Sequence, residues 1–220
     1  TAIDLKPQEV SILTKLAVAY VKTESLEDAL DTLNIAKKLK PKDPHIYNNI
    51  AYIHSKKKEF QLSILYYEKA LKLDSNNGDF LTNIGVAFAE NEEYEKAIRN
   101  YKRALKINPS NIHALKNLGI VHTRTGFFKE AIDCFKKALA FKNDFAEAFF
   151  GLGRAYLDLG EHSKSIKNYN KVLEVKPKHY STLHSLTWPM ILEKNFRKGW
   201  DMYEYRWHVE PQSKQNRPFK

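Results

Sequence analysis

Eight histidines and one cysteine are the side chains of this chain best suited to bind a transition metal. A metal site needs several such ligands close together, as a helical HxxxH pair beside a carboxylate would provide. The histidines form no such pair, and Cys134 has no second cysteine for a disulfide or a zinc site. No Ser-His-Asp, Cys-His or paired-carboxylate pattern stands above chance. The sequence therefore predicts no catalytic residues, no metal site, no cofactor and no enzymatic activity in this chain.

Two further motifs suggest chemistry but have a structural explanation. Gly151 and Gly153 frame a Gly-Leu-Gly segment similar to part of a phosphate-binding loop. Such a loop joins a strand to a helix, whereas these glycines fall inside a predicted helix. Phenylalanine and tyrosine recur at fixed spacings that suit a core better than an aromatic platform for a ligand. We interpret both motifs as packing.

Composition and charge narrow the class of protein. The 220 residues include 36 Lys and Arg against 26 Asp and Glu, a net charge of +10 that raises the question of nucleic acid. The longest uncharged stretch, residues 179–192, is too short and too polar to span a bilayer, which takes about 20 apolar residues. No signal peptide is visible, and a single cysteine is typical of a reducing, cytoplasmic compartment. The chain opens on Thr1, as a piece of a longer protein would.

A pattern of small and large residues recurs along the chain every 34 residues. The chain divides without insertions into the blocks 10–43, 44–77, 78–111, 112–145, 146–179 and 180–213. The eighth position of a block is small in the first five, as are most residues at the twentieth position. The twenty-fourth position is large, with Leu33, Tyr67, Tyr101, Phe135, Tyr169 and Tyr203. Proline stands at position 32 in four blocks, where it ends the unit because it cannot continue a helix.

This spacing predicts two packed helices in each block. Positions 4, 7, 8 and 11 share one face of a first helix, and positions 17, 20, 24 and 27 share one face of a second. Small residues at positions 8 and 20 allow the two helices to approach closely. A pair of this size cannot bury both of its faces alone, so successive pairs must stack.

The pattern resembles the tetratricopeptide repeat (TPR) family over nearly the whole chain. The resemblance implies an all-α fold, a right-handed superhelical solenoid of six 34-residue helix-turn-helix units with twelve helices. Residues 1–9 are then a lead-in and residues 214–220 a tail. The resemblance also implies a concave surface. It is lined by the face of each first helix that lies opposite the packing face, at positions 2, 6, 9 and 13.

That concave stripe supplies the candidate binding residues. The stripe holds five basic and four acidic side chains, so it is nearly neutral and does not favour nucleic-acid binding. We interpret the net positive charge of the chain as lysines on a solvent-exposed face elsewhere. An asparagine column at position 6 could donate to and accept from a peptide main chain, as a similar inward ladder does in O-linked N-acetylglucosamine transferases. The carboxylate clamp of chaperone-binding TPR modules is absent, since Ile120 and Gly151 stand at two of its positions. The predicted peptide-binding groove comprises Asn49, Tyr52, Asn83, Lys116, Asn117, Arg124 and Arg154.

The sixth block keeps the spacing but changes the chemistry. Pro189 falls inside its first helix, which should kink or restart there. Residues 196–207 resemble the divergent last TPR that precedes the glycosyltransferase-like domain of some bacterial proteins. Their aromatic residues should leave apolar surface exposed, and such surface is typical of an interface. The predicted C-terminal interface, for a following domain or for self-association, comprises Trp200, Tyr203, Tyr205 and Trp207.

Two functions remain open at this point. The first is a scaffold that recruits a protein or an extended peptide through the concave groove. The alternative is the substrate-recruiting N-terminal arm of a larger glycosyltransferase similar to the O-linked N-acetylglucosamine transferases, whose catalytic domain is not in this chain. A downstream nucleotide-sugar domain in the complete gene would decide between them.

Overall fold

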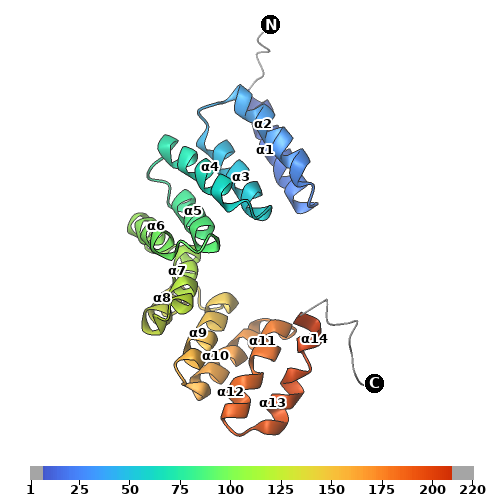
Figure 1. Cartoon of the computed structure of the whole chain (residues 1–220), viewed down its shortest axis with the longest axis vertical. Helices are drawn as coiled ribbons and strands as arrows, with labels where there is room; N and C mark the ends of the chain where they lie inside the picture. The colour runs from blue at the N-terminus through green and yellow to red at the C-terminus, as the bar shows by residue number, and fades with distance from the viewer. Residues whose placement is uncertain (1–6, 210–220) are drawn as a thin grey trace. The chain divides into compact units, whose positions relative to one another are not determined.

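The computed structural model describes residues 7–209, and every regular element in this range is a helix (Figure 1). The predicted all-α class is therefore confirmed. The chain divides into two compact units after Pro109, residues 1–109 and 110–220, which we call the first and second unit. The uniform repeat spacing gives no sign of this division, because the 34-residue period continues across it without interruption.

The first unit holds three helical hairpins, each a pair of neighbouring helices joined by a short turn. Within this unit α2 packs against α3 and α4 packs against α5, so the hairpins stack in chain order. Their helices are α1 (Pro7–Lys22), α2 (Leu26–Leu39), α3 (Pro44–Lys56), α4 (Phe60–Leu73), α5 (Gly78–Glu90) and α6 (Tyr94–Ile107).

The second unit begins with two hairpins of the same kind and ends with four shorter helices. Here α8 packs against α9 and α10 against α11 and α12. Its helices are α7 (Ile112–Arg124), α8 (Phe128–Phe141), α9 (Ala146–Asp158), α10 (His162–Val175), α11 (Tyr180–Ser185), α12 (Thr187–Leu192), α13 (Phe196–Tyr203) and α14 (Arg206–Val209).

Local sequence explains where the helices begin. The first helices of repeats two to six start at the first position of their 34-residue block, and all six second helices start at the seventeenth. Side chains of Asp43, Asn77 and Asn111 cap α3, α5 and α7 by accepting hydrogen bonds from the first free backbone N–H groups. The hairpin turn reverses the chain through a left-handed residue at position 15 of every block. That residue is glycine in two repeats, Gly126 and Gly160, and a strained Glu or Lys in the other four.

Close contact between positions 8, 20 and 24 holds each hairpin together. In the fifth repeat the Tyr169 ring packs against Gly153, where a Cβ would lie 2.5 Å from the ring. The Ser165 hydroxyl is fully buried and donates to the Gly153 carbonyl at 2.7 Å. Burial raises the pKa of Tyr169 to about 12, because the phenolate would lie in a medium of low dielectric constant. The small residues at these positions are thus part of the packing that the repeat pattern predicts.

In the sixth repeat both expected helices are divided, so the twelve helices of the repeat pattern appear as fourteen segments within residues 7–209. The expected interruption at Pro189 is confirmed, and it lies between α11 and α12. Proline has no N–H to donate to the carbonyl four residues earlier, at Ser185, and α11 ends at that residue. The second predicted helix, over 196–207, is also broken, since α13 ends at Tyr203 and α14 begins at Arg206.

Candidate functional site

A groove of about 700 Å³ lies within the second unit, between the exposed faces of α7 and α9. Of the concave stripe, it takes positions 9 and 13 from α7 and positions 2, 6, 9 and 13 from α9. We call this hollow the groove. Its lining comprises Lys116, Ile120, Thr123, Arg124, Phe135, Ala146, Glu147, Phe150, Gly151, Arg154, Asp158, Val172, Lys176 and His179.

Two ion pairs fix charged side chains at the edge of the groove. The Arg154 guanidinium donates from Nε to both carboxylate oxygens of Asp158, one turn further along α9, at 3.0 and 3.2 Å. Lys176 donates to Glu147 at 2.8 Å. This hydrogen bond with Lys176 holds the pKa of Glu147 below its ordinary value, with a smaller contribution from the charge of Lys116. Both acids are thus paired with bases of the same groove.

At Gly151, the backbone of α9 lies against the fully buried ring of Phe135. A Cβ at Gly151 would lie 2.3 Å from Cζ of Phe135, and a Cβ at Gly119 of α7 would lie 2.8 Å from the same ring. The ring therefore occupies the space under both helices. Phe150 forms the adjoining wall, with its ring centroid 5.5 Å from that of Tyr169 and 5.9 Å from that of His179. The interpretation of the Gly-Leu-Gly segment as close packing agrees with these distances.

Three of the predicted groove residues, Lys116, Arg124 and Arg154, lie together in this lining. Asn117 lies on α7 as well, half-buried, but is not part of the lining. Lys176 and His179 were not predicted, because they lie in the segment between α10 and α11, whereas the stripe was read from first helices alone. No feature of that segment's sequence points to the groove.

The asparagines of the first unit have structural partners that the sequence did not suggest. Asn83 of α5 donates to the Oδ1 of Asn48 at 3.0 Å, and Asn48 donates to Asn49 at 3.3 Å. The Asn83 amide therefore joins α5 to α3, and contact of Asn49 and Asn83 with a peptide stays a prediction. Asn49 and Tyr52 line a small hollow of about 60 Å³ beside α1. Tyr52 is half exposed, with the Lys56 ammonium 5.5 Å from its ring centroid.

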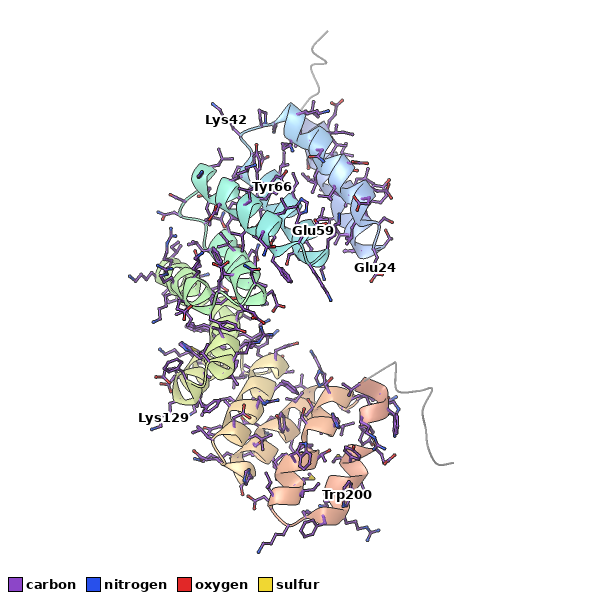
Figure 2. The ribbon with its side chains drawn as sticks, viewed as in Figure 1. Glu24, Lys42, Glu59, Tyr66, Lys129 and Trp200 are labelled. Atoms are coloured by element: carbon purple, nitrogen blue, oxygen red, sulfur yellow. The ribbon has the colours of Figure 1, made fainter. Side chains whose placement is uncertain are left out.

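The aromatic side chains of the sixth repeat differ from one another in exposure. Trp200, which is labelled in Figure 2, lies on α13. Its side chain is 59% exposed, whereas Tyr203, Tyr205 and Trp207 are half-buried. Tyr203 and Trp207 stack on the Arg206 guanidinium, which lies 4.0 Å from the ring centroid of Tyr203 and 4.3 Å from that of Trp207. Tyr205 lies near Tyr180 of α11, with ring centroids 6.1 Å apart. Trp200 is the member of this set with the most surface open to a partner.

Within residues 7–209, no group of three or more His, Cys, Asp or Glu side chains could hold a metal ion. Cys134 is buried and forms no disulfide within the described residues. In the same part of the chain, none of the helices is both long enough and apolar enough to cross a membrane.

Comparison with known protein families agrees with the helical hairpins. Models described as tetratricopeptide repeat match residues 44–77, 66–99 and 112–178, and one described as TPR repeat matches residues 87–126. The match over 44–77 coincides with the second 34-residue block. Among curated proteins, none matches this chain.

Solved structures show the same fold at low sequence identity. PilW, described as a widely conserved type IV pilus biogenesis factor, is 21% identical with a TM-score of 0.83, over 98% of this chain and 96% of that one. PilF of Pseudomonas aeruginosa is 18% identical with a TM-score of 0.80, over 93% of each chain. YrrB, described as a TPR protein with an unusual peptide-binding site, is 22% identical with a TM-score of 0.62, over 79% and 89%. Repeat spacing, hairpin packing and family matches together establish that this chain belongs to the tetratricopeptide repeat family.

Proposed function

We propose that this chain is a protein-binding scaffold that takes an extended segment of a partner protein into the groove of its second unit. The observation that carries the proposal is the groove itself, about 700 Å³ and lined by both apolar and charged side chains. Ligand sites are typically concave and mostly apolar, with a few polar groups that fix orientation. A role without catalysis in this chain agrees with the lack of a catalytic pattern in its sequence.

The likeness to YrrB, described as having a peptide-binding site, supports the same class of function. We further propose that the partner is a protein or peptide rather than a nucleic acid, because the groove combines both signs of charge. The prediction of a cytoplasmic location is kept on the evidence of the sequence, which has one cysteine.

The test compares what two variants of the full chain retain from cell extract. Ile120, 38% exposed on α7, lines the groove, and Ile120→Trp should fill it. Leu65→Trp on α4 of the first unit is the control, because Leu65 is similarly exposed at 44% and lies outside the groove. We expect Ile120→Trp to lose proteins that the parent chain and Leu65→Trp both retain, with the melting temperature preserved. Retention of the same proteins by both variants would contradict the proposal.

The arm of a glycosyltransferase is kept as a second proposal, because residues 196–207 carry the resemblance described above. Its test is the sequence encoded after Lys220 in the complete gene. A nucleotide-sugar domain there would support it, and its absence would leave the scaffold role alone. In that case the exposed side chain of Trp200 is available for self-association instead of a following domain.

A further inference from the structure

A second hollow, of about 590 Å³, lies within the first unit. Its walls come from α4 and α6, the second helices of the second and third repeats, and the α5 residues that it reaches stand on the packing face. None of its lining therefore belongs to the concave stripe. We call this hollow the basic crevice, because its lining holds four basic side chains and one acidic side chain, Lys72, Lys96, Arg99, Arg103 and Glu68.

Packing of the repeats does not explain the two arginines of α6. Arg99 stands at position 22 and Arg103 at position 26 of the third repeat. Position 22 is exposed in all six repeats, where it holds Asp31, Leu65, Arg99, Asp133, Lys167 and Asp201. Since this position accepts either sign of charge, the fold does not require a cation there.

Three of the four cations in the basic crevice have no acidic partner in the described part of the chain. Lys96 pairs with Glu93, one turn earlier on α6. Lys72, Arg99 and Arg103 are exposed and form no ion pair within residues 7–209. The one acid of the lining offsets only one of these three charges, so the crevice keeps an excess of positive charge.

The spacing of the arginines suits the carboxylates of an extended peptide. Arg99 and Arg103 share one face of α6 and lie about 6 Å apart along its axis. Two residues of an extended chain advance about 6.6 Å and return to the same face. A guanidinium binds a carboxylate through two parallel hydrogen bonds, so acidic residues two apart match the two arginines.

A nucleic acid fits the basic crevice less well, because its phosphates need a basic strip that continues along the surface. In the first unit, position 22 is Leu65 in the second repeat and Asp31 in the first. The strip therefore does not continue along the other second helices of this unit. Glu68, in the lining itself, would also repel a phosphate backbone.

We propose that the basic crevice binds an acidic segment of a partner protein. Two carboxylates of the segment pair with Arg99 and Arg103, while Lys72 adds a third positive charge from the opposite wall. Asn100 lies between the arginines and donates from Nδ2 to the Lys96 carbonyl at 2.9 Å, which leaves its Oδ1 to accept from a peptide N–H. The crevice and the groove belong to different units, and this inference does not depend on the proposed function.

The test uses two labelled peptides with blocked ends and the full chain. Ser-Glu-Ser-Glu-Ser-Glu-Ser presents its carboxylates on one face, and Ser-Gln-Ser-Gln-Ser-Gln-Ser has the same shape without charge. Fluorescence anisotropy at one fixed salt concentration measures both affinities. We expect the Glu peptide to bind about tenfold more tightly or better, because only its side chains form charge-assisted hydrogen bonds. Equal affinities, or no detectable binding of the Glu peptide, would overturn the inference.

Neutral variants identify the side chains that bind the carboxylates. Arg99→Gln with Arg103→Gln should weaken binding of the Glu peptide about tenfold or more, and Lys72→Gln should weaken it by a smaller factor. Lys102→Gln with Lys106→Gln is the matched control, because it removes the same charge from exposed positions of α6 outside the lining, and it should bind as the parent does.

Two further outcomes would contradict the inference. An equal loss of affinity in the two double variants would show that binding follows the net charge of the chain instead of the crevice. An oligodeoxythymidine that binds through Arg99 and Arg103 more tightly than the Glu peptide would assign the crevice to nucleic acid. Circular dichroism of each variant, expected to match the parent, shows that a lost affinity is not a lost fold.

Discussion

The fifth and sixth repeats of this chain share a period of 34 residues but differ in how they use it. In the fifth repeat, α9 and α10 are unbroken, and Tyr169 at position 24 is 1% exposed against Gly153. In the sixth, Pro189 and the break after Tyr203 divide both helices, and Tyr203 at the same position is only half-buried. A repeat period therefore records where helices begin, whereas the chemistry of each position decides whether they continue and pack.

The largest expected effect comes from removing the ring at position 24. Tyr169→Ala should lower the free energy of unfolding by about 3–5 kcal/mol, because it leaves a cavity in a fully packed hairpin. Tyr203→Ala in the sixth repeat should cost only about 1 kcal/mol, since that ring is half open to solvent. Urea unfolding of both variants measures the difference. Equal costs would mean that the sixth repeat is packed as tightly as the fifth.

Close contact at position 20 is a feature that the sixth repeat retains. Gly199 occupies it there, and a Cβ would lie 2.6 Å from Cγ1 of Ile191. In the fourth repeat Ala131 is fully buried, so Ala131→Leu should overpack the hairpin and cost about 1–3 kcal/mol. Lys136→Leu, on an exposed position of the same helix, should change the free energy of unfolding by less than about 0.5 kcal/mol. Denaturation midpoints that agree for the two variants would show that the assigned register is wrong.

Exposure of Trp200 is the feature that the sixth repeat adds. Position 21 holds half-buried Ile166 in the fifth repeat, whereas Trp200 is 59% exposed. We expect the apparent mass in light scattering to rise with protein concentration, and Trp200→Ser to suppress that rise while changing stability by less than about 0.5 kcal/mol. Ile35→Ser, at a side chain 49% exposed in the first unit, is the control and should associate as the parent does. A parent chain that stays monomeric at high concentration would contradict the prediction.

The smallest expected effect concerns the ion pair between Glu147 and Lys176, which joins the groove to the segment leading into the sixth repeat. Because Lys176 lowers the pKa of Glu147 in the folded chain, the pair stabilises the fold fully above about pH 4.5 and progressively less as the pH falls through the folded pKa. Glu147→Gln should therefore cost about 0.5 kcal/mol near pH 7, a value typical of exposed pairs, and nothing at the acidic end.

Thermal unfolding of the parent and Glu147→Gln, followed from neutral to acidic pH, measures this difference. Glu174→Gln is the matched control, since Glu174 pairs with Lys171 on the outer part of α10 at 2.7 Å, away from the groove lining. A difference between parent and Glu147→Gln that persists unchanged at acidic pH would show that the carboxylate acts through packing instead of charge.

Local sequence determined much of the fold. The period of 34 residues predicts the starts of the second helices, because small and large side chains alternate at the helical spacing that buries one face. The break near Pro189 could be predicted as well, since a missing N–H acts on its own helix. For the candidate site, the position of a residue on the helical wheel was enough to select Arg124 and Arg154, because direction around a helix axis follows from sequence spacing alone.

Other features were decided only by the tertiary structure. One of them is the division into two units after Pro109. The others bring together residues from different helices or segments: the bond from Asn83 to Asn48, and the position of Lys176 and His179 in the groove. Gly151 shows the reason most directly. Its spacing places it on the concave stripe, but the space that a side chain would need there is occupied by the Phe135 ring, which another helix, α8, carries. Sequence spacing determines the direction of a side chain from its own helix, and only packing between helices decides what it meets there.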